Sequence, residues 1–338
     1  MPPAPLPELD AVLDGLHVVT VPLRTRFRGV TEREFALVQG PAGWGEFGAF
    51  LEYPPKQAAA WLASAIEAGW WGWPEPVRDV IPINATVPAV APEQVPAILD
   101  LFGPCESVKV KVAEPGESLA DDIARVAAVR AAVGPDVWLR IDANGAWSLT
   151  QALEALRSLS RFGLEYAEQP CASVPELREL RVLLAAMRID TPIAADESIR
   201  KAEDPLLVAR EGAADLLVIK AAPLGGVRRA LAIVAESGLP AVVSSSLDTS
   251  VGMAAGVALA GALPHLEHDC GLGTVELLAA DVTRSPLVPV DGEIVVRPVS
   301  ANPLLLDALS APEERQAWWR ERVAACYEGA LAILDSVG

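Results

Sequence analysis

The chain has 338 residues, of which 51% are hydrophobic and 21% are charged. This composition excludes a disordered chain, and the length allows a barrel of ordinary size plus a small additional domain. Asp and Glu outnumber Lys and Arg by 45 to 27, which gives a net charge of -18. Without a basic cluster, this charge argues against nucleic acid and anionic membranes as partners.

The N-terminal segment and the cysteines indicate a soluble cytoplasmic protein. Met1–Asp10 is rich in proline and lacks the basic start and apolar centre of a secretory signal. The longest uncharged run, Thr249–Pro264, is shorter than the roughly 20 residues that cross a bilayer. The cysteines show no paired spacing and are expected to be reduced; they are Cys105, Cys171, Cys270 and Cys326. No segment predicts a particular oligomeric state.

Residues 1–79 predict a small α+β region. Short alternating strands are expected around Leu16–Leu23 and Phe35–Val38, followed by a glycine-rich turn and a helix near Lys56–Ala68.

From residue 80 onward, short apolar β-branched runs alternate with stretches of helical period, which is typical of a parallel βα array. Eight strands are predicted: Val80–Val87, Ser107–Val112, Val137–Asp142, Glu165–Glu168, Pro192–Asp196, Asp215–Lys220, Pro240–Ser246 and Leu266–Cys270. Helices between them include Leu119–Val133, Thr150–Phe162, Pro175–Met187 and Val227–Ser237, with helix ends at Gly134, Gly163, Gly212 and Gly238.

This count predicts a (β/α)8-type barrel, with room for one irregular unit, and a capping α+β domain. The alternative is a doubly wound sheet, which the absence of a Gly-x-Gly-x-x-Gly turn disfavours. After Asp291 we expect a strand and the helix Glu313–Leu334. The expected organisation is an N-terminal capping domain (1–79), a catalytic barrel (80–290) and a C-terminal segment (291–338) that packs on the cap.

Charged side chains follow the predicted strands at the end that forms the active face of such barrels. Lys109 and Lys111 alternate with valines on the second strand, so both point to one side. The other charged residues at these ends are Asp142, Glu168, Asp196 and Lys220. A cluster of three carboxylates therefore lies between two sets of ammonium groups.

Three carboxylates offer oxygen ligands for Mg²⁺, with Mn²⁺ as a possible substitute, and leave positions for water and a substrate carboxylate. The metal would stabilise negative charge on that small-molecule carboxylate as a neighbouring proton leaves, and lysines on opposite faces would move the proton.

Each motif also has a structural interpretation. The Lys-Val-Lys strand can be a solvated edge strand, and Asp142, Glu168 and Asp196 can serve as turn, strand-end or helix-cap residues. Gly225 and Gly226 can cradle an anion at a helix start or simply make a turn. Two functions of other classes are a Schiff-base aldolase that uses Lys220 and a silent barrel that only binds ligand. The joint placement of the charges favours the metal site.

With these residues in place, the chain resembles the enolase superfamily, in its muconate-lactonizing-enzyme-like subgroup, over essentially its whole length. The matching motifs are Lys109-Val-Lys111, Asp142-Ala-Asn144, Glu168-Gln-Pro170, Asp196-Glu-Ser198 and Lys220 followed by Gly225-Gly226. The resemblance implies that Asp142, Glu168 and Asp196 are Mg²⁺ ligands. It implies that Lys111 and Lys220 are the general acid and base, with Lys109 near the substrate carboxylate.

Within the subgroup, the chain most resembles the branch that dehydrates a cyclohexadiene carboxylate to o-succinylbenzoate. The markers of this likeness are weaker than the metal set: Arg140, the short cap, the serine run 244–246 and Gly271-Leu-Gly273-Thr274. Together with Lys109 of the superfamily motif, the expected substrate contacts are Lys109, Arg140, Ser245, Ser246 and Gly271. Serines at the seventh strand end, where the mandelate-racemase-like subgroup has a histidine, make that activity unexpected. N-succinylamino acid racemization uses the same residues and is the close alternative, and dipeptide epimerization is less favoured.

Overall fold

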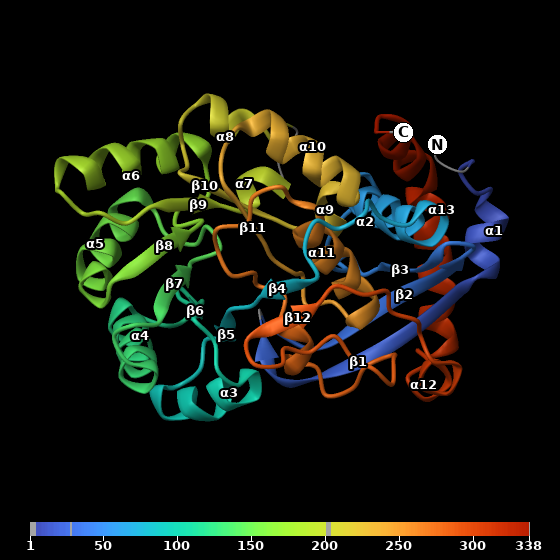
Figure 1. Cartoon of the computed structure of the whole chain (residues 1–338), viewed down its shortest axis with the longest axis horizontal. Helices are drawn as coiled ribbons and strands as arrows, with labels where there is room; N and C mark the ends of the chain where they lie inside the picture. The colour runs from blue at the N-terminus through green and yellow to red at the C-terminus, as the bar shows by residue number, and fades with distance from the viewer. Residues whose placement is uncertain (1–4, 28, 201–203, 338) are drawn as a thin grey trace.

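The computed structural model describes residues 5–27, 29–200 and 204–337. Two parts lie side by side in Figure 1, a curled parallel sheet with helices outside it and a smaller part built around an antiparallel sheet. The first four residues of the proline-rich segment, and therefore part of the leader prediction, lie outside the described residues.

The curled sheet has seven parallel strands in the order β5 to β11. They are β5 (Ala85–Val87), β6 (Ser107–Lys111), β7 (Trp138–Asp142), β8 (Leu164–Glu168), β9 (Ile193–Ala195), β10 (Leu216–Ile219) and β11 (Ala241–Val243). Isolated parallel bridges from Ile83 to Cys270 and from Ser244 to Gly271 join the two edges. The sheet therefore closes as a (β/α)8-type barrel with one irregular unit, as predicted.

The eighth predicted strand, Leu266–Cys270, is wrong as a strand, because only Cys270 and the following residue bridge to neighbours. The side chain of Asp269 accepts a hydrogen bond from Ser107 Oγ at 2.6 Å, and His268 contacts Glu165. His268 and Asp269 are thus held by polar side-chain contacts, and among the described residues of this segment Cys270 alone is held by backbone hydrogen bonds to the first barrel strand region.

The first predicted strand, Val80–Val87, is two strands. β4 (Val80–Pro82) leaves the barrel and pairs antiparallel with β12 (Glu293–Val295), while β5 stays in the barrel sheet. Asn84 lies at the break, where its Nδ2 donates to the Ala85 carbonyl at 2.9 Å and to Thr86 Oγ1 at 3.2 Å. Such local side-chain bonds compete with a regular ladder.

Three barrel helices begin with the same local signal. Ser118, Ser148 and Ser173 precede α4 (Leu119–Val133), α5 (Leu149–Leu159) and α6 (Val174–Ala186), each in a reciprocal capping arrangement with the third helical residue. The four predicted stop glycines all have positive φ, as helix-ending residues require.

The remaining helices of the barrel part range from single turns to the 13 residues of α11. They are η2 (Pro92–Gln94), α3 (Val95–Phe102), η3 (Ser160–Phe162), α7 (Glu197–Arg200), α8 (Leu207–Arg210), α9 (Ala221–Leu224), α10 (Val227–Ser237), α11 (Ser250–Ala262) and η4 (Thr274–Leu277). In the described part of the chain, no helix combines the length and the apolar character needed to cross a membrane.

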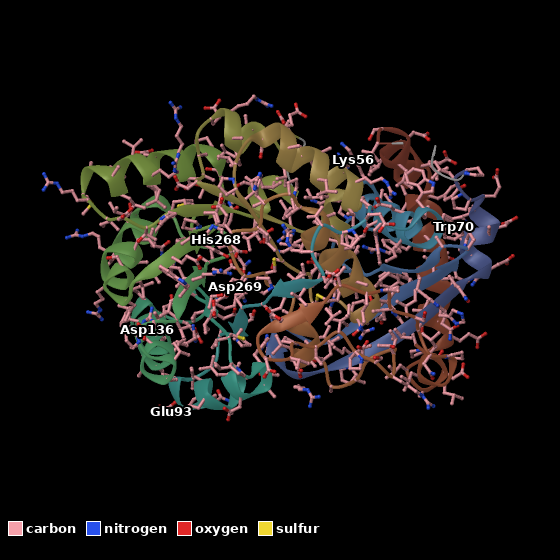
Figure 2. The ribbon with its side chains drawn as sticks, in the orientation of Figure 1. Lys56, Trp70, Glu93, Asp136, His268 and Asp269 are labelled. Carbon is pink, nitrogen blue, oxygen red and sulfur yellow. The ribbon has the colours of Figure 1, made fainter. Side chains whose placement is uncertain are left out.

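The second part, called the cap below, combines both ends of the chain. It contains α1 (Leu9–Asp14), β1 (Leu16–Phe27), β2 (Val30–Gly40), β3 (Gly43–Phe47), α2 (Pro55–Ile66), the π-helical turn η1 (Glu67–Trp71), α12 (Pro303–Ala308) and α13 (Glu313–Asp335). Trp61 and Trp319 are buried together in its core, and Trp319 Nε1 donates to Glu34 at 2.7 Å. Figure 2 shows Lys56 and Trp70 on this side of the molecule. The domain boundaries at residues 79 and 290 stay predictions.

Candidate active site

Strand register places three charged residues in one row across the barrel. Lys111 of β6 pairs with Asp142 of β7, and Asp142 pairs with Glu168 of β8. Residues in register on adjacent parallel strands point to the same face, and this face is the barrel interior. The β6 strand is paired on both sides, with β5 and β7, and Lys109 is only 5% exposed, so the edge-strand interpretation is wrong.

Each carboxylate of the site faces a lysine. Lys111 Nζ pairs with Asp142, Lys109 Nζ with Glu168 at 3.1 Å, and Lys220 Nζ with Asp196 at 2.5 Å. The three carboxylates come from β7, β8 and the end of β9, and none is more than 1% exposed. The structure therefore brings together all five residues predicted as metal ligands or proton carriers, with Lys109 beside them.

The three carboxyl groups of the site differ in the direction in which their pKa is shifted. Burial raises the pKa of Asp142, but the Lys111 and Lys109 ammonium groups outweigh burial, and its pKa lies below its usual range. Lys220 and Arg200 outweigh burial at Asp196 in the same way. Burial and then the Asp142 carboxylate raise the pKa of Glu168, and the Lys109 and Lys111 ammonium groups offset this rise only in part. One more positive charge near Glu168 would stabilise its ionised form.

Lys109 is held as a cation. Burial lowers its pKa, but the Glu168 and Asp142 carboxylates outweigh this and raise the pKa above its ordinary value. Its Nζ also lies 3.4 Å from Ser244 Oγ. A permanently charged ammonium group can attract a substrate carboxylate but is a poor proton acceptor.

The turns after the barrel strands adopt unusual backbone conformations. Ala113, Asn144, Gln169 and Leu247 have φ of 61°, 48°, 38° and 64°, in the left-handed region that side chains disfavour. Backbone strain of this kind clusters at functional sites. Here it occurs after β6, β7, β8 and β11, at the end of the barrel where the charged residues lie.

Two residues of the quoted motifs connect adjacent strand ends. Asn144 donates its backbone N–H to Asp142 Oδ1 at 2.9 Å, and its side-chain oxygen accepts from Lys111 Nζ at 3.0 Å. Gln169 Oε1 accepts from the backbone N–H groups of Asp196 and Ser198 at 2.9 and 3.1 Å. These bonds fix the positions of Asp142 and Asp196 relative to their neighbours.

Arg200 is a site residue that the sequence analysis missed. Its Nε donates to Asp196 Oδ1 at 2.9 Å, its Nη2 to Glu197 at 2.5 Å and its Nη1 to the Tyr53 hydroxyl of the cap at 3.0 Å. The spacing of four residues from Asp196 on a short helix was an available signal. The partner Tyr53 lies too far away in sequence to be found locally.

The donor chemistry fits a hard divalent cation. Three buried carboxylates supply oxygen ligands of the type that Mg²⁺ prefers. Glu168 Oε1 is buried without a hydrogen-bond partner among the described residues, as expected of an oxygen reserved for a cation. Within the same described ranges, no three acidic, histidine or cysteine side chains converge in a metal-binding arrangement. Each of the three carboxylates contacts a lysine.

A small cavity, called the central cavity, lies over these residues. It is lined by Phe50, Thr86, Lys109, Lys111, Asp142, Lys220, Ser244, Ser245, Ser246, Leu247, Gly271 and Thr274. A wider cleft of about 670 Å³ shares Lys111 with it and also contains Asn144. Four of the five predicted substrate contacts, all except Arg140, therefore line the cavity. Phe50 comes from the cap, and no local signal in the sequence pointed to it.

Gly271 leaves room that a side chain would fill. A Cβ atom at this position would lie 2.7 Å from Ser244 Oγ and 3.5 Å from Lys109 Nζ. Ser245 Oγ donates to the Gly271 carbonyl at 2.8 Å and contacts Thr274 Oγ1 at 2.7 Å. The serine loop and Gly271 thus form one wall.

Arg140 does not lie at the cavity, which corrects the prediction that it binds substrate. It is two residues before Asp142 and therefore one layer deeper in the barrel. Its guanidinium donates to Glu165 at 2.5 Å, to Asn84 Oδ1 at 3.0 Å and to the Asp269 carbonyl at 2.5 Å. Glu165 also contacts His268 Nδ1 at 2.7 Å. We call these five residues the floor network; His268 and Asp269 are visible in Figure 2.

Comparisons with solved structures agree with the fold. The muconate lactonizing enzyme from Pseudomonas putida superposes with a TM-score of 0.72 at 20% identity, covering 88% of this chain and 98% of that chain. The N-succinyl Arg/Lys racemase from Bacillus cereus gives 0.73 at 18% identity, with coverage of 88% and 97%. At these identities the likeness concerns the barrel and cap alone.

Sequence comparisons are more specific. Residues 18–69 match the family described as enolase N-terminal domain-like, and residues 93–300 match enolase C-terminal domain-like. The o-succinylbenzoate synthase of Mycolicibacterium smegmatis is 58% identical over 95% of this chain and 98% of its own length. That of Mycobacterium marinum is 58% identical over 96% of both chains. The chain belongs to the enolase superfamily and, within it, to the o-succinylbenzoate synthase family of metal-dependent hydro-lyases.

Proposed function

We propose that this protein dehydrates 2-succinyl-6-hydroxy-2,4-cyclohexadiene-1-carboxylate to o-succinylbenzoate, a step of menaquinone biosynthesis. The observation that carries the proposal is the 58% identity to o-succinylbenzoate synthases over nearly the whole chain. The geometry supports it, because Lys109, Lys111, Lys220 and Asp142 line one cavity. Glu168 and Asp196 lie beside it, paired with Lys109 and Lys220.

Lys111 is the proton carrier in this proposal. Its neutral Nζ removes the proton from the ring carbon that bears the carboxylate, and the electron pair of that C–H bond moves into the ring. The resulting ammonium group then gives the proton to the departing hydroxyl group, so that water leaves and the ring becomes aromatic. The Lys111 side chain borders both the central cavity and the wider cleft, which supports its contact with an entering substrate.

Asp142, Glu168 and Asp196 would hold Mg²⁺, or Mn²⁺ in its place. When bound, the cation supplies positive charge that offsets the negative charge developing on the substrate carboxylate. The three side chains come from strand ends fixed by Asn144 and Gln169, which supports a rigid ligand set.

Lys220, Lys109 and the serine wall position the substrate. Lys220 faces the cavity from the side of β10, opposite β6, and serves as a cation toward the intermediate. Lys109 attracts the substrate carboxylate. Ser245, Ser246 and Gly271 shape the wall on which the ring or the succinyl group rests.

The arrangement of two lysines also favours a second activity, racemization of N-succinylamino acids. In that reaction one lysine removes the α-proton and the other delivers a proton to the opposite face. Lys111 and Lys220 come from β6 and β10 and border the same cavity, which meets this requirement.

An assay of the purified protein with both substrate classes tests the proposal. We expect rapid formation of o-succinylbenzoate from the cyclohexadiene acid and slower proton exchange at the α-carbon of N-succinylamino acids. Racemization at a higher kcat/KM than dehydration would assign the second activity as the main one and refute the proposal.

A further inference from the structure

The cap contributes a carboxylate to the start of a barrel helix. Glu67 of η1 is 1% exposed, and its Oε2 accepts from the backbone N–H of Val227 at 2.6 Å. Its Oε1 accepts from the backbone N–H of Arg228 at 3.1 Å and from Arg228 Nη1 at 2.9 Å. The first N–H groups of a helix lack partners within the helix and carry partial positive charge. At α10 the cap itself supplies the missing acceptor.

Gly226 makes this approach possible. Its φ is 119°, and a Cβ atom at this position would lie 2.1 Å from Glu67 Oε2. The glycine pair that resembled either an anion cradle or a turn is therefore occupied by an anion of the same chain. The contact gives a structural reason for Gly226 in the motif of Lys220 followed by Gly225-Gly226, although Gly226 takes no part in the reaction.

The contact between Glu67 and α10 lies close in sequence to Lys220. Only α9 separates Lys220 at the end of β10 from the start of α10, and α9 packs against α2 of the cap. Arg228 Nη1 also donates to the Gly72 carbonyl at 2.7 Å, which fastens the end of η1 to the same helix. Displacing Glu67 would therefore disturb the segment that carries Lys220.

A second cap carboxylate makes a matching contact at the next helix. Glu46 of β3 accepts from the hydroxyl group of Thr249 and from its backbone N–H at 3.3 Å, at the start of α11. The segment before α11 is the loop that lines the central cavity from Ser244 to Leu247. Both contacts thus join the cap to the barrel beside the site, where Phe50 of the cap lines the central cavity.

We propose that Glu67 is a positioning residue for the reaction, whose carboxylate docks the cap on the Gly226–Arg228 helix start and thereby sets the placement of Lys220 and Phe50 around the substrate. This inference rests on the proposed function for its kinetic readout and on the docking geometry for its thermal readout.

The test is chemical rescue of Glu67→Ala by sodium formate, with sodium chloride at equal ionic strength as the reference. Removing the side chain leaves an empty place at the helix start that a formate ion fits. We expect kcat/KM to fall by about ten- to a hundredfold, mainly through kcat, because a shifted cap and a shifted Lys220 lose their alignment. Formate should restore most of the lost kcat and raise the Tm of this variant, while leaving the wild-type protein unchanged.

Two further variants keep the inference testable if Glu67→Ala does not fold. Gly226→Ala should lower kcat in the same way without response to formate, because the new methyl group fills the place of the carboxylate. Glu67→Gln retains the shape of the side chain but not its charge, and its kcat should lie between those of the wild-type protein and Gly226→Ala. Wild-type kcat/KM in both would overturn the inference.

Glu34→Ala is the matched control, since it removes a carboxylate that is paired with Arg315 and Trp319 inside the cap. It should lower Tm while kcat stays near the wild-type value. An equal loss of kcat in Glu34→Ala and Glu67→Ala, or no effect of formate on either kcat or Tm of Glu67→Ala, would refute the docking role. If the wild-type protein does not dehydrate the cyclohexadiene acid, the proposed function is wrong, whereas the formate-dependent Tm still tests the docking.

Discussion

The barrel interior contains two polar layers that differ in how their charges are balanced. In the floor network, three groups accept hydrogen bonds from Arg140, and His268 adds a second partner for Glu165. In the layer above, burial and then the Asp142 and Asp196 carboxylates raise the pKa of Glu168, one oxygen of which has no partner among the described residues. A satisfied network stabilises a fold, whereas crowded like charges require an additional ligand.

The largest effect should come from the upper layer, through Lys111→Ala. Because this variant removes the proposed proton carrier, we expect kcat to fall by about 10²- to 10⁴-fold with the fold intact. Initial rates of o-succinylbenzoate formation, combined with a circular dichroism spectrum, measure this. Dehydration at a rate close to that of the wild-type protein would mean that another residue carries the proton.

Asp196→Ala should have the next largest effect on activity. It removes one proposed metal ligand and also leaves Lys220 and Arg200 without their shared acceptor. We expect activity to vanish at low Mg²⁺ concentration and to return in part at high concentration. A titration of initial rate against Mg²⁺ measures this. A variant that keeps full activity at low Mg²⁺ would remove Asp196 from the metal site.

A substitution in the floor network should lower stability rather than activity. Arg140→Met leaves Glu165 without its buried cation, so we expect the free energy of unfolding to fall by about 3 kcal/mol while kcat changes little. Urea unfolding and kinetics of the folded variant measure the two quantities. Unchanged stability with a large loss of kcat would place Arg140 in the chemistry after all and erase the distinction between the layers.

Gly271→Ala should give the smallest effect, at the boundary of the upper layer. The added methyl group would press on Ser244 Oγ, a short side chain that can rotate away. We expect KM for the cyclohexadiene acid to rise by a few-fold, with Tm nearly unchanged, because only the cavity wall moves. A fall in kcat without a change in KM would argue that Gly271 affects the proton carrier instead.

Much of the upper layer was predictable from local sequence. Alternation along β6 and β7 determines which side chains enter the barrel, so the sequence alone assigns Lys109, Lys111 and Asp142 to one face. The same rule misplaced Arg140, because alternation gives the face of a residue but not the partners of its side chain. Lys109 lies in register with Arg140 and reaches the cavity, whereas the Arg140 guanidinium is held in the floor network by Glu165, Asn84 and Asp269.

The other errors and omissions have non-local causes. Residues 80–87 look like one strand, but β4 pairs with β12 more than 200 residues away in the chain. Glu67 and Phe50 act on the barrel through contacts between distant segments, for which no periodic pattern exists in the sequence. Side chains that join the cap to the barrel are therefore the part of the site that only the structure reveals.

Metal removal tests the central claim most directly, since the upper layer is proposed to be incomplete without a divalent cation. The protein is treated with a chelator, and o-succinylbenzoate formation is followed as Mg²⁺ is added back. We predict no turnover in the stripped protein and a saturable return of the full rate. Undiminished turnover without metal, together with trapping of substrate on Lys220 by borohydride, would contradict the account and identify a Schiff-base enzyme.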